Sequence, residues 1–127
     1  MSGATSRAEH AGLVVTSDLI FATKIRSTAD ALGLHVTIAA TAAQAIELAQ
    51  TSPPRLVVID LGAALSDVSG LVATLRNLGG PDTKIVAYGA HVDAARLEEA
   101  LRAPCDEVMP RSKFSGTLPE ILRRHLA

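Results

Sequence analysis

Five short apolar runs, each followed by a segment of helical periodicity, constrain the fold of this chain more than any other feature. Most of the runs are unbroken, which is typical of parallel strands covered by helices on both faces. We expect strands over residues 12–16, 34–40, 55–61, 83–89 and 105–110. We expect helices over residues 18–33, 42–50, 71–80, 93–102 and 116–127.

Five βα units with right-handed crossovers leave few topologies. The flavodoxin-like (βα)5 fold, a doubly wound five-stranded parallel sheet in the order 2-1-3-4-5, suits this length. In the first unit, Ser17 is expected to cap a helix whose apolar stripe comprises Leu19, Ile20, Ile25, Ala29 and Leu32. In the second unit, Thr41 is expected to cap the helix. A site in such a sheet lies at the carboxyl ends of strands one and three.

The length of 127 residues predicts one domain, over residues 11–127, behind a disordered tail at residues 1–10. Apolar residues make up 48% of the chain, enough for a packed core. The aromatic residues are Phe21, Tyr88 and Phe114, too few to form a base-stacking platform.

Charge, cysteine content and hydropathy restrict the partners and the compartment. The net charge is −1 and the basic residues are scattered along the chain, so neither a nucleic acid nor a membrane is expected as a partner. The single cysteine, Cys105, excludes an internal disulfide and fits a reducing compartment. No apolar run approaches the ~18 residues that span a bilayer. We therefore expect a cytoplasmic protein.

Motifs of common enzymes are missing from the sequence. It has no GxxxxGK[ST] phosphate loop, no GxSxG elbow and no Cys/His set with metal-ligand spacing. His91 follows strand four and is interpreted as a solvated loop residue. The remaining candidate is Asp60, a carboxylate at the end of strand three. We therefore expect no enzymatic activity and no cofactor.

Residues 11–127 resemble the receiver domain of bacterial two-component response regulators in element order, in length and in the Asp that ends strand three. In that family this Asp accepts a phosphoryl group from a histidine kinase, and Asp60 matches its position. The simpler alternative is that Asp60 only ends a buried strand, accepts a hydrogen bond from a backbone N–H near Gly62 or Ala63, and pairs with Arg111.

The acidic pair that holds magnesium in the family falls on Thr16 and Ser17, neither of which carries a charge. A register shifted by one places Ser17 and Asp18 there and keeps one carboxylate. A metal held by Asp18 and Asp60 would then be weak. Either alignment leaves a depleted magnesium site.

Three further family positions also differ. The strand-four Ser or Thr falls on Gly89, the strand-five aromatic on Val108, and the Lys that follows strand five on Arg111. Arg presents a planar fork and not a point charge, so this exchange is not conservative. Lys113 is two residues too late to replace that Lys.

We interpret the chain as a degenerate receiver, or pseudo-receiver: an interaction module without efficient aspartyl phosphorylation. Its expected partner is a kinase or output protein that binds the face formed by the fourth helix, fifth strand and fifth helix, which could also pair two copies. The candidate residues of this face are Val92, Leu97, Leu101, Phe114 and Leu118. One alternative is a divergent but working receiver that uses Asp60 with Mg²⁺. A small α/β enzyme or ligand-binding subunit ranks last.

Overall fold

The computed structural model describes residues 12–63 and 67–127, so the expected tail at residues 1–10 and the start of the domain at residue 11 lie outside the described residues. Strands and helices alternate along this part of the chain. In order they are β1 (Gly12–Val15), α2 (Leu19–Ala31), β2 (Val36–Ala39), α3 (Ala42–Thr51), β3 (Leu56–Asp60), α4 (Val68–Gly79), β4 (Lys84–Gly89), α5 (Ala94–Arg102), β5 (Glu107–Pro110) and α6 (Arg111–Leu126).

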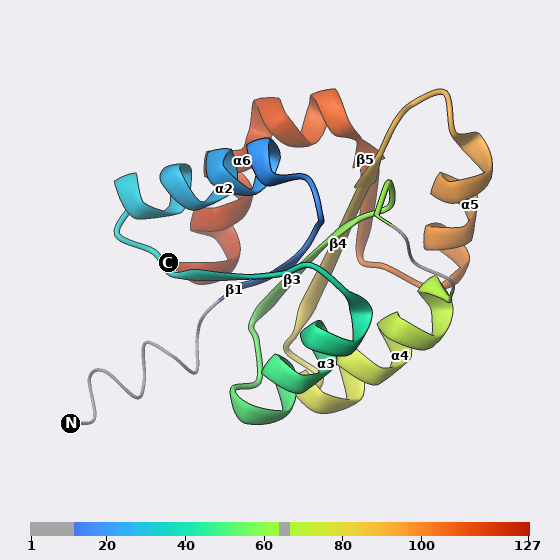
Figure 1. Ribbon diagram of the computed structural model, residues 1–127, viewed down its shortest axis with the longest axis horizontal. Coiled ribbons are helices and arrows are strands. Elements are labelled where there is room, and N and C mark those ends of the chain that lie inside the picture. The colour runs from blue at the N-terminus through green and yellow to red at the C-terminus, as the bar shows by residue number, and fades with distance from the viewer. Residues whose placement is uncertain (1–11, 64–66) are drawn as a thin grey trace.

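The strands of the described residues form one five-stranded sheet in the order β2-β1-β3-β4-β5, and every pair of neighbouring strands is parallel. This confirms the flavodoxin-like order predicted from the sequence. The sheet is covered on both sides, with α2 and α6 above it and α3 and α4 below it in Figure 1. No described helix is long and apolar enough to cross a membrane.

Alternate residues of the central strands supply two separate cores. In β3, Leu56 and Val58 pack with α2 and α6, whereas Val57 and Ile59 pack with the core of α3, α4 and α5. All four side chains are fully buried. Because successive strand residues point to opposite faces, Asp60 continues the row of Leu56 and Val58 and faces the α2–α6 side.

The start of α2 differs from the sequence expectation. Asp18, not Ser17, is its N-cap, since the Asp18 carboxylate accepts a hydrogen bond from Phe21 N at 3.1 Å. Leu19 and Ile20 do not join the buried stripe, as they are 81% and 86% exposed. Both lie in the first turn of α2. The expected cap of α3 is confirmed, because Thr41 accepts from Gln44 N.

Two later helices begin earlier than expected. Helix α4 starts at Val68, because Asp67 caps it by accepting from Gly70 N. Helix α6 starts at Arg111, directly after β5, although the sequence interpretation began it at residue 116. Phe114, four residues before Leu118, belongs to the buried stripe of α6, so the apolar stripe extends N-terminal to residue 116.

Candidate functional site

Asp60 is the last residue of β3 and lies at the carboxyl edge of the sheet. Its partner in β4 is Tyr88, and Thr16 directly follows the adjacent strand β1. Asp60 is only 3% exposed and Thr16 only 2%. The two polar side chains therefore meet in a nearly dry environment at the switch point of the sheet.

Both carboxylate oxygens of Asp60 are engaged. Thr16 Oγ1 donates to Asp60 Oδ2 at 2.7 Å, and Gly62 N donates to Asp60 Oδ1 at 2.8 Å. Arg111 approaches Oδ1 to 3.9 Å, at the outer limit of an ion pair. The expected hydrogen bond to the loop backbone and the expected pairing with Arg111 are both present. These contacts give Asp60 a structural role that does not require phosphorylation.

Gly62 permits the close turn after β3. A Cβ at this position would lie 3.1 Å from Asp60 Oδ1 and 3.4 Å from an Arg111 nitrogen. Such a methyl group would crowd both partners. The sequence marked this glycine only as part of a loop, and its contact with the carboxylate is a tertiary feature.

The three residues that follow β1 have separate roles. Thr16 donates to Asp60 and accepts from Asp18 N at 3.1 Å. Ser17 is exposed. The Asp18 carboxylate caps α2 through Phe21 N. The local turn thus uses Asp18 as a helix cap, in agreement with the ability of Asp to satisfy the first amides of a helix.

These residues do not fit a magnesium ion. Mg²⁺ requires near-octahedral oxygen ligands, usually with one or two carboxylates available to it. Here Asp60 is hydrogen-bonded to Thr16, and Asp18 is hydrogen-bonded to the α2 backbone. Within residues 12–63 and 67–127, no group of three or more His, Cys, Asp or Glu side chains could hold a metal. We therefore derive no metal-dependent step for this site.

Gly89, the last residue of β4, is closely packed. A Cβ there would lie 3.3 Å from the Cβ of Leu61 and 3.6 Å from Leu97. The Leu61 backbone is fixed by a hydrogen bond from its N–H to Tyr88 O at 2.8 Å. A side chain at position 89 would therefore press on Leu61, whose backbone is held in place.

Arg111 is the first residue of α6 and follows Pro110, which pairs with Gly89 across the sheet. Its side chain is 44% exposed, and its guanidinium lies 5.8 Å from the centroid of the Phe21 ring. The cation is shared between Asp60 and an aromatic face. Val108, the position of the expected strand-five aromatic, is partly buried and packs on the opposite face of the sheet.

The sequence interpretation missed an aromatic cluster beside Asp60. Tyr88 stacks on Phe114 with a centroid distance of 4.5 Å, and Phe21 lies 5.1 Å from Tyr88 and 5.9 Å from Phe114. These are the three aromatic residues of the chain. Their gathering is not visible in sequence spacing, although each lies within a few residues of a strand end or helix start.

The Tyr88 hydroxyl is buried and has no hydrogen-bond partner among the described residues. Burial raises the pKa of Tyr88 well above its ordinary value, and the charge of Asp60 adds to the effect, which nearby Thr16 partly offsets. The hydroxyl therefore stays protonated. Tyr88 lies beside Asp60 in the sheet, but its hydroxyl donates no hydrogen bond to the Asp60 carboxylate.

The candidate partner face requires a correction. Phe114 and Leu118 were expected on it, but both are fully buried against the sheet, so neither can contact a partner. Leu97 is partly buried under Gly89. Val92 is 80% exposed and Leu101 59% exposed, so these two residues remain accessible around α5.

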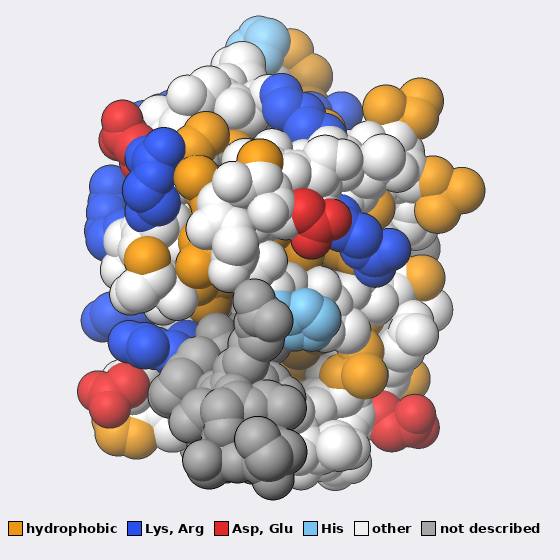
Figure 2. Space-filling model, turned by 90° about the vertical axis from the view of Figure 1, so that its left-hand side faces the viewer, with side chains coloured by type: hydrophobic (Ala, Val, Ile, Leu, Met, Phe, Trp, Pro, Cys, Tyr) orange, Lys and Arg blue, Asp and Glu red, His pale blue; other side chains and the backbone are white. Residues whose placement is uncertain are grey.

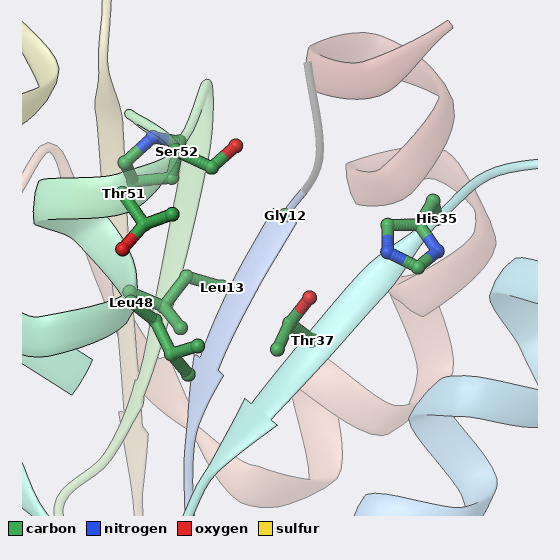
Figure 3. Close-up of a pocket in the computed structure, with 8 residues that line it drawn as sticks. Gly12, Leu13, His35, Thr37, Leu48, Thr51 and Ser52 are labelled. Atoms are coloured by element: carbon green, nitrogen blue, oxygen red, sulfur yellow. The ribbon is translucent and has the colours of Figure 1, made fainter. Parts of the chain in front are cut away.

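One hollow lies at the opposite, amino-terminal edge of the sheet. It encloses about 150 Å³ between β1, β2 and the end of α3, and its lining residues include Leu13, His35, Thr37 and Leu48. Figure 3 shows Leu13 and Leu48 on one side, and Thr37 of β2 with His35, which directly precedes β2, on the other. His35 is the single titratable group among its described lining residues, so the hollow has no acid, base and nucleophile set.

Comparison with known proteins places the chain by its fold. No protein-family model and no curated protein sequence matches it. Among solved structures, it is similar to a CheY-like response regulator receiver domain protein from Methanospirillum hungatei JF-1, with a TM-score of 0.77, 19% identity, and coverage of 92% of this chain and 93% of that one.

Two further similar structures contain ions. The first is the receiver domain of a sensor histidine kinase from Pseudomonas aeruginosa PAO1 with a magnesium ion in its active-site cleft, at a TM-score of 0.77, 22% identity, and coverage of 92% and 97%. The second is a response regulator from Burkholderia pseudomallei with a phosphorylated aspartic acid and a calcium ion. Its TM-score is 0.73 and its sequence identity 20%, and the match covers 93% of this chain and 66% of that one. At these identities the likeness establishes the CheY-like receiver fold.

Proposed function

We propose that this chain is a pseudo-receiver: a protein-interaction module of bacterial two-component-type signalling that works in the cytoplasm without efficient phosphorylation of Asp60. The observation that carries the proposal is the pair of short hydrogen bonds from Thr16 and Gly62, which occupies both oxygens of the Asp60 carboxylate. The receiver fold supports the signalling context.

Phosphorylation of Asp60 would be opposed by its surroundings. A carboxylate oxygen must attack phosphorus and form an acyl phosphate while the donor's leaving group departs, which replaces the single negative charge of the carboxylate with the two of the phosphoryl group at a site that is 3% exposed. The nearby permanent cation is Arg111, whose nitrogen is 3.9 Å from Oδ1. Because the residues present do not fit a divalent cation, this charge would remain largely uncompensated.

A phosphoryl group would also lack a reporter. Position 89 has no side chain and therefore no hydroxyl, and a Cβ there would already lie against Leu61 and Leu97. We therefore expect the accessible apolar residues around α5, Val92 and Leu101, to keep the same exposure whether or not Asp60 is modified. We infer that a kinase or output protein, or a second copy of the chain, binds this surface constitutively.

Incubation with Mg²⁺ and acetyl phosphate, followed by intact-mass measurement and amide NMR, tests the proposal. We expect no added phosphoryl mass and no shift of the Leu61, Gly62 and Gly89 amides. Asp60→Asn is the matched control for modification at other sites. Stoichiometric phosphorylation that disappears in Asp60→Asn would overturn the proposal and support the divergent, working receiver.

A second experiment tests the docking surface. Leu101→Asp places a charge in the exposed apolar area without removing a core contact. We expect it to reduce self-association, measured by analytical ultracentrifugation at high concentration, while Asp60→Asn leaves it unchanged. If the wild-type chain stays monomeric, the homodimer is excluded and the surface is left to a different protein.

A further inference from the structure

A polar hollow lies at the amino-terminal edge of the sheet, away from Asp60. It measures about 520 Å³ and is lined by Arg55, Asp82, Lys84, Arg124 and His125. These residues come from the segment before β3, the start of β4 and the last turn of α6. On the side of the molecule that bears the carboxyl terminus, Lys and Arg side chains gather along the left-hand margin (Figure 2).

The sheet register explains why these charges meet. Leu56 pairs with Lys84, and Lys84 N donates to Arg55 O at 2.9 Å, so Arg55, directly before β3, lies beside Lys84, the first residue of β4. Leu56 packs toward α6, and Lys84 at the same level faces the same side. Basic residues that are scattered in the sequence are thereby brought to one edge.

Existing ion pairs do not neutralise this cluster. Arg124 pairs with Glu107 at 3.3 Å. No ion pair involves the side chain of Arg55 or Lys84 within residues 12–63 and 67–127. Arg124 in the last turn of α6 is accounted for by the helix dipole, which favours cations there. Arg55 and Lys84 are not on that helix, and the dipole does not account for them.

His125 does not add a permanent charge to the hollow. Burial lowers the pKa of His125, the charge of Glu107 opposes this effect, and the charges of Arg124 and Lys84 add to it. Its Nε2 is buried, lies 3.8 Å from Glu107 and has no hydrogen-bond partner among the described residues. At neutral pH the cations of the hollow are therefore Arg55, Lys84 and Arg124.

We propose that this hollow binds a small polyvalent anion of the phosphate class, held by Arg55, Lys84 and Arg124. Arg and Lys donors that converge from separate segments suit a tetrahedral oxyanion with several acceptor oxygens. The Asp82 carboxylate in the lining repels anions, so a polyvalent ligand is required to outweigh it. The described lining residues include no Phe, Tyr or Trp on which a base could stack, so the phosphate moiety and not a base is recognised.

NMR titration of the full chain with inorganic pyrophosphate at low ionic strength tests this site. We expect saturable shifts of the amides at Arg55, Lys84 and Arg124, and roughly tenfold weaker binding in Arg55→Gln and in Lys84→Gln. Neither substitution removes an ion pair found among the described residues, so both variants should fold. Arg102→Gln, at the end of α5 on the other face of the sheet from α6, removes the same charge and should bind like wild type.

Other outcomes would overturn the assignment. These are the absence of saturation, equal weakening by Arg102→Gln, and tighter binding of a polyglutamate peptide or a short single-stranded DNA than of pyrophosphate. Comparison of pyrophosphate with ADP distinguishes a free phosphate from a nucleotide as its source. Asp60→Asn should leave binding unchanged, so failure here is distinguishable from failure of the proposed function.

Discussion

Removal of the Thr16 hydroxyl should destabilise the domain more than its small size suggests. Thr16→Val keeps the shape of the side chain but removes the 2.7 Å hydrogen bond to Asp60 and the acceptor for Asp18 N at 3.1 Å. A hydrogen bond to a charged group contributes about 1.5–3 kcal/mol and one between neutral groups about 0.5–1.5 kcal/mol. We expect the free energy of unfolding to fall by about 2–4 kcal/mol.

Urea unfolding measures this loss. For an m value of about 2 kcal/mol/M, the midpoint should fall by about 1–2 M. Thr16→Ser is the matched control, because it keeps the hydroxyl and loses one methyl group, at a cost of about 1 kcal/mol. The cost of Thr16→Val should shrink in an Asp60→Asn background, where the acceptor is neutral. The reasoning would be refuted if Thr16→Val lowered the free energy of unfolding no more than Thr16→Ser does. It would also be refuted if the loss in Thr16→Val were the same with Asp and with Asn at position 60.

Three other side chains give separate tests. Tyr88→Phe should raise the free energy of unfolding by about 1 kcal/mol, because it removes a buried hydroxyl that has no partner among the described residues. Because burial raises the pKa of Tyr88 above 10.0, wild type should lose stability relative to Tyr88→Phe as the pH rises past that value. Urea titrations at several pH values measure this, and a constant difference in the free energy of unfolding would contradict the burial effect. Burial raises the pKa of Cys105 from 9.0 to about 11, so alkylation by iodoacetamide at mildly alkaline pH should be roughly 100-fold slower in the folded than in the urea-unfolded chain, and equal rates would show an accessible thiolate. Partial burial alone would raise the pKa of Asp106, but hydrogen bonds from Ile85 N and Arg76 lower it below 3.8. Asp106→Asn should therefore destabilise at neutral pH, and the difference from wild type should close as pH falls through the folded pKa; a difference that persists in strong acid would assign the effect to packing.

Much of the fold could be predicted because its signals are local. Apolar runs such as residues 55–61 separate strands from helices, and short connections between them leave the parallel order 2-1-3-4-5. The position of Asp60 at the end of β3 follows from the same pattern. Helix starts were predicted less well: Asp67 and Asp18 cap helices through backbone hydrogen bonds that several nearby polar residues could have made.

The sequence by itself determined the sheet, the place of Asp60, the absence of charged side chains at positions 16 and 17, and the absence of a hydroxyl at position 89. The tertiary structure decided what Asp60 contacts, because Thr16 and Arg111 are distant in sequence and meet it only across the sheet edge. It also decided that Phe114 is core and that Arg55, Lys84 and Arg124 share one hollow. Periodicity reports which face a residue takes, whereas the side chains it meets there depend on strand order and register.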